Sequence, residues 1–182
     1  DLCGDRDIQL TYTVYNLNCT DPLPTGTPIA FYANTTLVGQ SQTNAIIPID
    51  GEQTNTITIT IPTEIGADFQ LNIFVDDNGS GISTVFEIIE DNNQDSALIS
   101  LPELPEESIL QNIALCDVTP TQSFDLTQGI VQADSQSLLS FYESFTDANT
   151  SQNSIVNPTN YTNIENPQQI FVRADNTECY LI

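Results

Sequence analysis

The first hundred residues alternate between apolar and polar side chains with a period of two, which predicts half-buried β-strands. The clearest case is TNTITITIP at 54–62, in which Ile57, Ile59 and Ile61 share one face and threonines share the other. Alternation or a short apolar run predicts further strands in DIQLTYTVYN (7–16), PIAFYANTTLVGQ (28–40, two strands), FQLNIFVD (69–76), TVFEIIE (84–90) and SALISLP (96–102). About seven short strands separated by turn residues are typical of an immunoglobulin-like β-sandwich.

The second half of the chain has shorter apolar segments, which predict a smaller β domain. Strands are expected in SLLSFYES (137–144), QIFVRADN (169–176) and ECYLI (178–182), and short helical turns in SFDLTQGIVQ (123–132) and FTDANTSQN (145–153). The stretch LPELPEES at 101–108 combines two prolines with three glutamates, which indicates a stiff, solvated linker. The predicted fold class is all-β, with two tandem β-sandwich (Ig-like) domains, the second smaller with one or two short helical turns. Their predicted bounds are 1–102 and 110–182, with a Pro/Glu linker at 103–109.

The charge and composition of the chain limit the classes of binding partner and of enzyme reaction that can be expected. Its 182 residues include 25 Asp and Glu but only two Arg and no His, so the formal net charge is −23. Nucleic acid and anionic membrane surfaces would be repelled, and no apolar segment reaches the length of a transmembrane helix. Catalytic triads that need His are excluded, and nothing singles out a carboxylate pair for glycoside hydrolysis. We therefore expect no enzyme activity, no nucleic-acid partner and no direct membrane insertion.

Four cysteines, Cys3, Cys19, Cys116 and Cys179, are divided equally between the two predicted domains. None lies in a CxxC motif and His is absent, so a zinc site is not expected. An even number of cysteines in an acidic chain rich in Thr and Asn indicates an oxidising, extracytoplasmic setting. Four cysteines allow three connectivities, of which pairing within each half is the simplest: Cys3 with Cys19, and Cys116 with Cys179.

One acidic stretch, FVDDNGSGISTVFEIIEDNN at 74–93, contains a candidate metal site. Residues 76–87 match the calcium-loop pattern D-x-[DN]-x-[DN]-G-x5-E with one departure, a serine at the fifth position. Such a loop binds Ca²⁺ through side-chain oxygens and one backbone carbonyl. The candidate ligands are the side chains of Asp76, Asn78, Ser80 and Glu87 and the carbonyl of Ile82. Because predicted strands rather than helices flank the loop, the alternative is a polar hairpin turn.

Other conspicuous side chains are expected to serve structure. Aromatic residues such as Tyr12, Phe31 and Phe69 lie at inward positions of predicted strands, where core packing is the usual role. Arg173 is expected to pair with a nearby carboxylate, Asp175 or Asp147, because Arg forms strong bidentate bonds to carboxylates.

Several short motifs, in order along the chain, carry a resemblance to known families. TYTVYN, LPTGTPIAFYAN, IPTEIGADFQLNIFVDDNGSG and EIIEDNN resemble the CARDB-type, Ig-like adhesion domains of bacterial surface proteins. In the second half, FDLT, FYES, NPTNYTN, IFVRADN and the final Cys resemble a module repeated in very long secreted proteins of gliding Bacteroidota. Those proteins are exported by the type IX system and include gliding-motility adhesins. The resemblance implies a repeated stalk or adhesin segment rather than an enzyme.

These inferences predict a secreted, cell-surface segment that is a non-enzymatic structural or spacer part of a long bacterial adhesin or filament. Its expected partners are neighbouring domains or copies of the same protein, and surface polysaccharide. Two alternatives stay open. One is a module that binds a polysaccharide or a protein, which an exposed aromatic groove would favour. The other is a filament subunit that polymerises by strand exchange through a terminal segment such as ECYLI.

Overall fold

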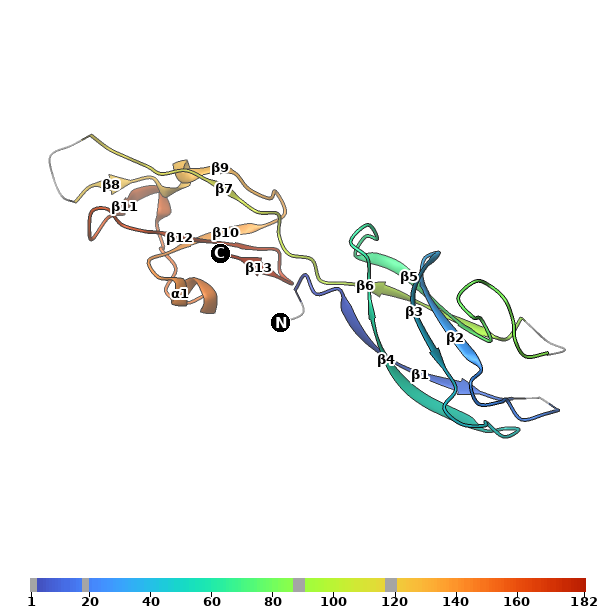
Figure 1. Cartoon of the computed structure of the whole chain (residues 1–182). Helices are drawn as coiled ribbons and strands as arrows, with labels where there is room; N and C mark the ends of the chain where they lie inside the picture. The colour runs from blue at the N-terminus through green and yellow to red at the C-terminus, as the bar shows by residue number, and fades with distance from the viewer. Residues whose placement is uncertain (1–2, 18–19, 87–90, 117–120) are drawn as a thin grey trace. The chain divides into compact units, whose positions relative to one another are not determined.

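The computed structural model describes residues 3–17, 20–86, 91–116 and 121–182, and its regular structure is mostly β-strand (Figure 1). The prediction of an all-β fold class is confirmed. The chain forms two compact units. The sandwich unit is Asp5–Leu101, and the terminal unit combines Pro102–Ile182 with the described residues of Asp1–Gly4. The backbone therefore leaves the terminal unit after Gly4 and returns to it at Pro102.

The strands of the sandwich unit form two antiparallel sheets. Its described part contains β1 (Asp7–Tyr15), β2 (Pro28–Ala33), β3 (Thr36–Gln42), β4 (Glu52–Thr60), β5 (Asp68–Val75) and β6 (Gln94–Ser100). One sheet has the order β3-β2-β5-β6, and the other pairs β1 with β4. Figure 1 shows the β1–β4 pair as a long, curved ribbon. Both strands of that pair have the strict alternation that made them the clearest predictions.

The inward side chains of the two sheets meet in two apolar clusters that share partly buried neighbours. Tyr12 and Val14 of β1 pack with Ile29 and Phe31 of β2, and the rings of Tyr12 and Phe31 meet edge to face at 5.1 Å between centroids. On β4, Ile59 belongs to the second cluster and Ile57 packs against both. The outward threonines of β1 and β4 instead bond across the strands, as Thr11 does with Thr56. The predicted two-faced strands are therefore confirmed, because apolar burial selects one face of each strand.

The strand predicted at 84–90 is not formed in its described part. Thr84, Val85 and Phe86 lie in a loop, and the Phe86 side chain is 93% exposed. Residues 87–90 lie outside the described residues. The backbone N–H groups of Thr84 and Val85 donate to the carboxylate of Asp76 rather than to a neighbouring strand. A side chain has thus replaced the sheet partner that the apolar pattern implied.

The terminal unit is built from short strands, one α-helix and two 3₁₀ turns within its described residues. They are β7 (Ile109–Leu110), β8 (Ser123–Phe124), η1 (Leu126–Gly129), β9 (Ile130–Gln132), β10 (Leu138–Tyr142), α1 (Phe145–Thr150), η2 (Pro158–Asn160), β11 (Tyr161–Thr162), β12 (Phe171–Asp175) and β13 (Tyr180–Leu181). The sheet β10-β12-β13 is its largest. Helix α1 begins after Ser144, whose Oγ accepts a hydrogen bond from the backbone N–H of Asp147. The helical turns predicted in 123–132 and 145–153 are confirmed as η1 and α1.

None of the helices in the described parts of the chain is both long and apolar enough to cross a membrane.

Candidate functional site

A disulfide bond between Cys3 and Cys179 closes almost the whole chain into a loop. The two residues are 176 positions apart, and both belong to the terminal unit. The pairing predicted within each half is therefore wrong for both of them. Cys116, the predicted partner of Cys179, carries a free, exposed thiol. Cys19, the predicted partner of Cys3, lies outside the described residues.

Hydrogen bonds fasten the segment around Cys3 to the terminal unit. The backbone N–H of Gly4 donates to the carbonyl of Pro102 at 3.1 Å. Gly4 has a φ of 72°, and a Cβ at this position would lie 3.0 Å from a methyl group of Leu104. The amide of Asn176 donates to the carbonyl of Glu103 at 2.9 Å, and its oxygen accepts from the backbone N–H of Cys179 at 2.8 Å. Residues near Cys3, Pro102 and Cys179 thus form one hydrogen-bonded junction.

Arg173 supports the hairpin that presents Cys179. Its guanidinium donates from two nitrogens to one carboxylate oxygen of Asp175 and from a third to the carbonyl of Ala148 in α1. It also lies 3.4 Å from the centre of the Tyr180 ring, a favourable cation–π distance. The bonds from Arg173 hold the pKa of Asp175 below its ordinary value. The predicted pairing of Arg173 with Asp175 is confirmed, and it joins α1 to strands β12 and β13.

The sandwich unit holds its own first and last residues firmly. Arg6 donates to the carbonyls of Ile61 and Pro62 at 3.0 Å each, and also to that of Ile65. The backbone N–H of Leu101 donates to the carbonyl of Ala67 at 3.1 Å. Ile61, Ile65 and Leu101 belong to one buried apolar cluster. Both chain crossings between the units therefore begin at residues that are fixed in the sandwich unit.

In the candidate calcium loop, the carboxylate of Asp76, which occupies the first position of the motif, accepts hydrogen bonds from the loop itself. Asp76 is 2% exposed, and its two oxygens accept from the backbone N–H groups of Thr84 and Val85 and from the Thr84 hydroxyl, at 2.6–2.8 Å. Asp77 accepts from the backbone N–H groups of Gly79 and Gly81 at 2.8 Å and from the hydroxyl of Tyr32. A calcium ion would have to compete with these donors for the same oxygens.

Three other predicted ligands, Asn78, Ser80 and Ile82, are joined by hydrogen bonds within the loop. Asn78 accepts from the backbone N–H and the hydroxyl of Ser80, and the carbonyl of Ile82 accepts from the backbone N–H of Asn78 at 3.4 Å. Glu87 lies outside the described residues. Within the described ranges, no three His, Cys, Asp or Glu side chains stand together as a metal site would need. Calcium binding at this loop stays a prediction.

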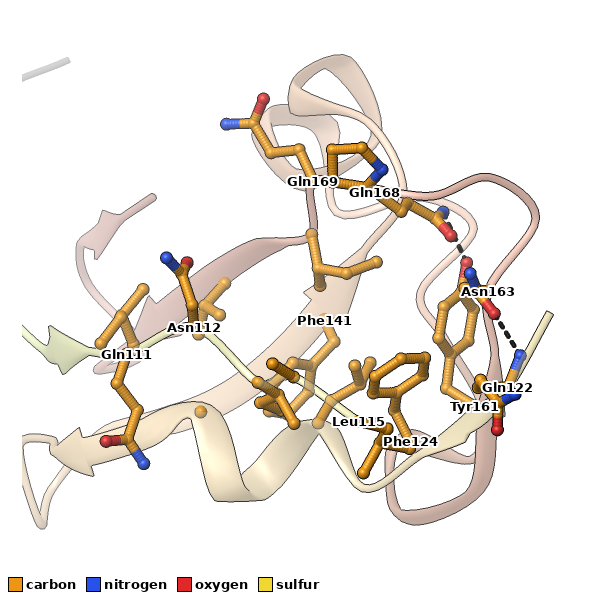
Figure 2. A pocket seen from close by; sticks show the side chains of 18 of the residues that line it. Gln111, Asn112, Leu115, Gln122, Phe124, Phe141, Tyr161, Asn163, Gln168 and Gln169 are labelled. Carbon is orange, nitrogen blue, oxygen red and sulfur yellow. Dashed lines mark hydrogen bonds between the residues drawn. The ribbon is translucent and has the colours of Figure 1, made fainter. Parts of the chain in front are cut away.

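The terminal unit also contains a cavity of about 840 Å³ (Figure 2). Residues 110–115 line one part of it, and strands β8, β10, β11 and β12 contribute Phe124, Phe141, Tyr161 and Val172. Figure 2 shows the hydrogen bonds that join Gln122 to Asn163 and Gln168 to Tyr161 at one side. No sequence motif indicated this cavity, because its lining comes from segments far apart along the chain.

The described lining of the cavity is uncharged, although the chain as a whole is strongly acidic. Amide side chains are frequent in it, namely Gln111, Asn112, Gln122, Asn163, Asn166, Gln168 and Gln169. One lining residue contacts a carboxylate, because the hydroxyl of Tyr161 donates to Glu143 at 2.9 Å. Burial, together with that carboxylate, raises the pKa of Tyr161. Such a lining suits an uncharged, hydroxyl-rich ligand better than an ion.

Comparison with known proteins finds a family model that matches part of the terminal unit. Residues 112–182 match the family described as the Flavobacterium inter-domain disulphide bond domain. This match ties that part of the chain to proteins of Flavobacterium, whereas the resemblance of the first half to CARDB-type domains is not confirmed. No curated protein and no solved structure matches the chain.

Proposed function

We propose that this chain is a non-enzymatic structural segment of a long, secreted bacterial surface protein. The observation that carries the proposal is the disulfide between Cys3, which precedes the sandwich unit, and Cys179 at the end of the terminal unit. A bond that fastens a preceding segment to a following unit serves the architecture of a multidomain chain. The family match of residues 112–182, whose description names an inter-domain disulphide bond, supports the same role.

The chemistry of that bond supports the proposal of an extracellular location. Disulfides of this kind persist in oxidising compartments and are rare in the cytosol. The net charge of −23 keeps neighbouring copies apart and limits aggregation. Among the turn carboxylates that the structure describes, Asp76 and Asp77 bind backbone N–H groups of their own loop, which is a structural use. The expected neighbours are other domains or copies of the same protein.

The location is tested by labelling intact cells that produce the protein with an antibody raised against these 182 residues. We expect surface labelling without permeabilisation. Labelling that appears only after the cells are opened would contradict the proposal. The resemblance to gliding-motility adhesins is tested in the same cells by following their movement on a surface after the segment has been removed from its gene.

The cavity of the terminal unit favours a second candidate function, the binding of a neutral polysaccharide. Its aromatic and amide lining resembles the mixture of apolar surface and hydrogen-bonding groups that sugars need. Titration calorimetry of the purified chain with neutral oligosaccharides separates the two functions. Saturable binding that is lost in Asn112→Ala and kept in Asn153→Ala would favour the binding module. The absence of saturable heat would favour the structural segment.

Calcium binding by the loop at 76–87 is a separate proposal for the sandwich unit. Its test is a melting curve in EDTA and then with added Ca²⁺. A rise of several degrees in the melting temperature with Ca²⁺ would support a bound ion, whereas an unchanged curve would reject it.

The contacts of the segment 178–182 within its own chain disfavour the strand-exchange alternative. Leu181 and Tyr180 pair with Ala174 and Asp175 of the same chain, and Cys179 is bonded to Cys3. Exchange of this segment between copies would have to break both the strand pairing and the disulfide.

A further inference from the structure

We propose that the Cys3–Cys179 bond bears the force when the chain is pulled from both ends. Residues 4–178 then form a closed loop that this force does not stretch. The inference rests on the proposed structural role and refines it. It concerns force applied to the backbone before Cys3 and after Cys179, which is how a segment within a long surface protein would be pulled.

The covalent connections between Cys3 and Cys179 explain why the two units would bear no tension. With the bond formed, the shortest covalent connection from Cys3 to Cys179 runs through two side chains and one S–S bond, and the Cα atoms lie 5.6 Å apart. The alternative path runs through 176 peptide units. Tension acts on the short path, because the long path is slack until the bond breaks. Hydrogen bonds and apolar packing in the units therefore need not resist the load.

The same connectivity changes how the segment contributes to a longer chain. Both crossings into the sandwich unit, Gly4–Asp5 and Leu101–Pro102, lie inside the closed loop. The sandwich unit is consequently a side branch of the tension path and not a link in it. Along that path the whole segment adds only about the separation of two bonded cysteines. The segment thus displays a domain at the side of the chain, and it does not lengthen the chain as a spacer would.

The number of residues in the closed loop determines how much contour length a force measurement should release. A stretched chain extends by roughly 3.5 Å per residue, so release of the loop would add about 600 Å of contour length. Unfolding of residues 5–101 alone would account for about 340 Å of this. If Cys3 were instead bonded to Cys19, as the sequence predicted, the bond would hide only about 55 Å.

The test is single-molecule force spectroscopy on the full chain held between cysteine-free handles at its two ends. Cys116→Ser is the parent protein for the measurement, because it removes the free thiol found among the described residues and keeps the Cys3–Cys179 bond. Cys3→Ser in that background is the matched variant without the bond. Dithiothreitol provides a chemical comparison, since it becomes a cyclic disulfide as its two hydrogen atoms pass to the sulfurs of Cys3 and Cys179.

In the oxidised parent we expect no unfolding steps before the tether detaches. In the Cys3→Ser variant, and in the parent after dithiothreitol, we expect steps that sum to about 600 Å. Steps of that total in the oxidised parent would overturn the inference, as would their absence from Cys3→Ser. If the steps of the oxidised parent summed to only about 55 Å less than those of the reduced protein, the bond would join Cys3 to Cys19. That result would also overturn the inference. None of these results bears on surface labelling, so the proposed location is judged independently.

Discussion

Carboxylates bind backbone N–H groups and hydroxyls in several turns of this chain. Asp125 accepts from Thr127, and Asp147 accepts from Ser144 and Asn153. These hydrogen bonds hold the pKa values of Asp125 and Asp147 below their ordinary range. Several of the described acidic residues therefore have a local structural role in turns and at a helix end.

Asp77 shows how such a carboxylate depends on its partners. Burial opposes its ionisation, but hydrogen bonds from the Tyr32 hydroxyl and from backbone N–H groups of Gly81 and Gly79 outweigh burial and lower its pKa. The effect on Tyr32 is reciprocal, because burial and the bond to Asp77 raise the pKa of its hydroxyl to about 12. At neutral pH the pair is a protonated donor and an ionised acceptor.

We predict that Tyr32→Phe destabilises the sandwich unit by about 1.5 kcal/mol at pH 7, because a hydrogen bond to a charged group is lost. Asp77 has a lowered pKa when folded, so its stabilising contribution is present above its ordinary pKa of 3.8 and disappears as the pH falls through the folded value. The difference between variant and wild type should therefore shrink below pH 4. Urea unfolding at pH 7 and at pH 2.5 measures both values.

Tyr15→Phe is the matched control, since Tyr15 on β1 is 57% exposed. We expect it to change the free energy of unfolding by less than about 0.5 kcal/mol at either pH. Equal losses in Tyr32→Phe and Tyr15→Phe, or a Tyr32→Phe loss that is the same at both pH values, would contradict the assigned hydrogen bond.

At the scale of elements, alternation predicted those strands whose one face is buried. Strands β1 and β4 agree with the sequence pattern because each inward side chain meets the opposite sheet. Residues 84–86 show where the pattern fails. Their apolar character suggested a strand, but the buried carboxylate of Asp76, just after β5, accepts the backbone N–H groups of Thr84 and Val85. A periodicity argument cannot include such a bond, because it depends on the fold of the preceding turn.

The same turn explains why the calcium motif was matched in sequence. Asp, Asn and Gly at these spacings suit a metal loop, and they equally suit a turn closed by side-chain to backbone hydrogen bonds. Asp76 has a φ of 62°, a left-handed conformation that Asp tolerates better than most residues. The sequence could identify the loop and its residue types, but the partners of its oxygens depend on three-dimensional geometry.

We predict that Asp76→Ala destabilises the sandwich unit by about 3 kcal/mol, because three donors from Thr84 and Val85 lose their acceptor. Urea unfolding in the presence of EDTA measures this cost without any contribution from bound metal. Asp68→Ala, at an exposed carboxylate of β5, is the control and should cost much less. If Asp76→Ala were harmful only when Ca²⁺ is present, the internal hydrogen bonds would not be the reason for the carboxylate.

At the scale of the whole molecule, the pairing of the cysteines was beyond sequence reasoning. The sequence correctly indicated a disulfide, but it offered no local signal that residues 176 positions apart would meet. That encounter depends on Cys3 and Gly4 joining the terminal unit, where Gly4 bonds to Pro102. The cavity was missed for a similar reason, since its lining is assembled from segments that are distant in sequence.

We predict that Cys3→Ser destabilises the terminal unit by about 4 kcal/mol, because the bond restricts the unfolded chain. The sandwich unit should keep its stability, since both cysteines of the bond belong to the terminal unit. Hydrogen exchange read by mass spectrometry separates the two units within one sample. Cys116→Ser is the control and should leave both unchanged, whereas an equal loss in both units would show that they unfold as one.

The most direct measurement uses the scarcity of cationic residues in the sequence. Trypsin can cut only after Arg6 and Arg173, which gives the peptides 1–6, 7–173 and 174–182. Digestion of the urea-unfolded, unreduced protein, with free thiols blocked, should release a small species in which 1–6 is joined to 174–182 through Cys3 and Cys179. Mass spectrometry that instead found either short peptide attached to 7–173, which holds Cys19 and Cys116, would contradict the closed loop on which the proposed mechanics depends.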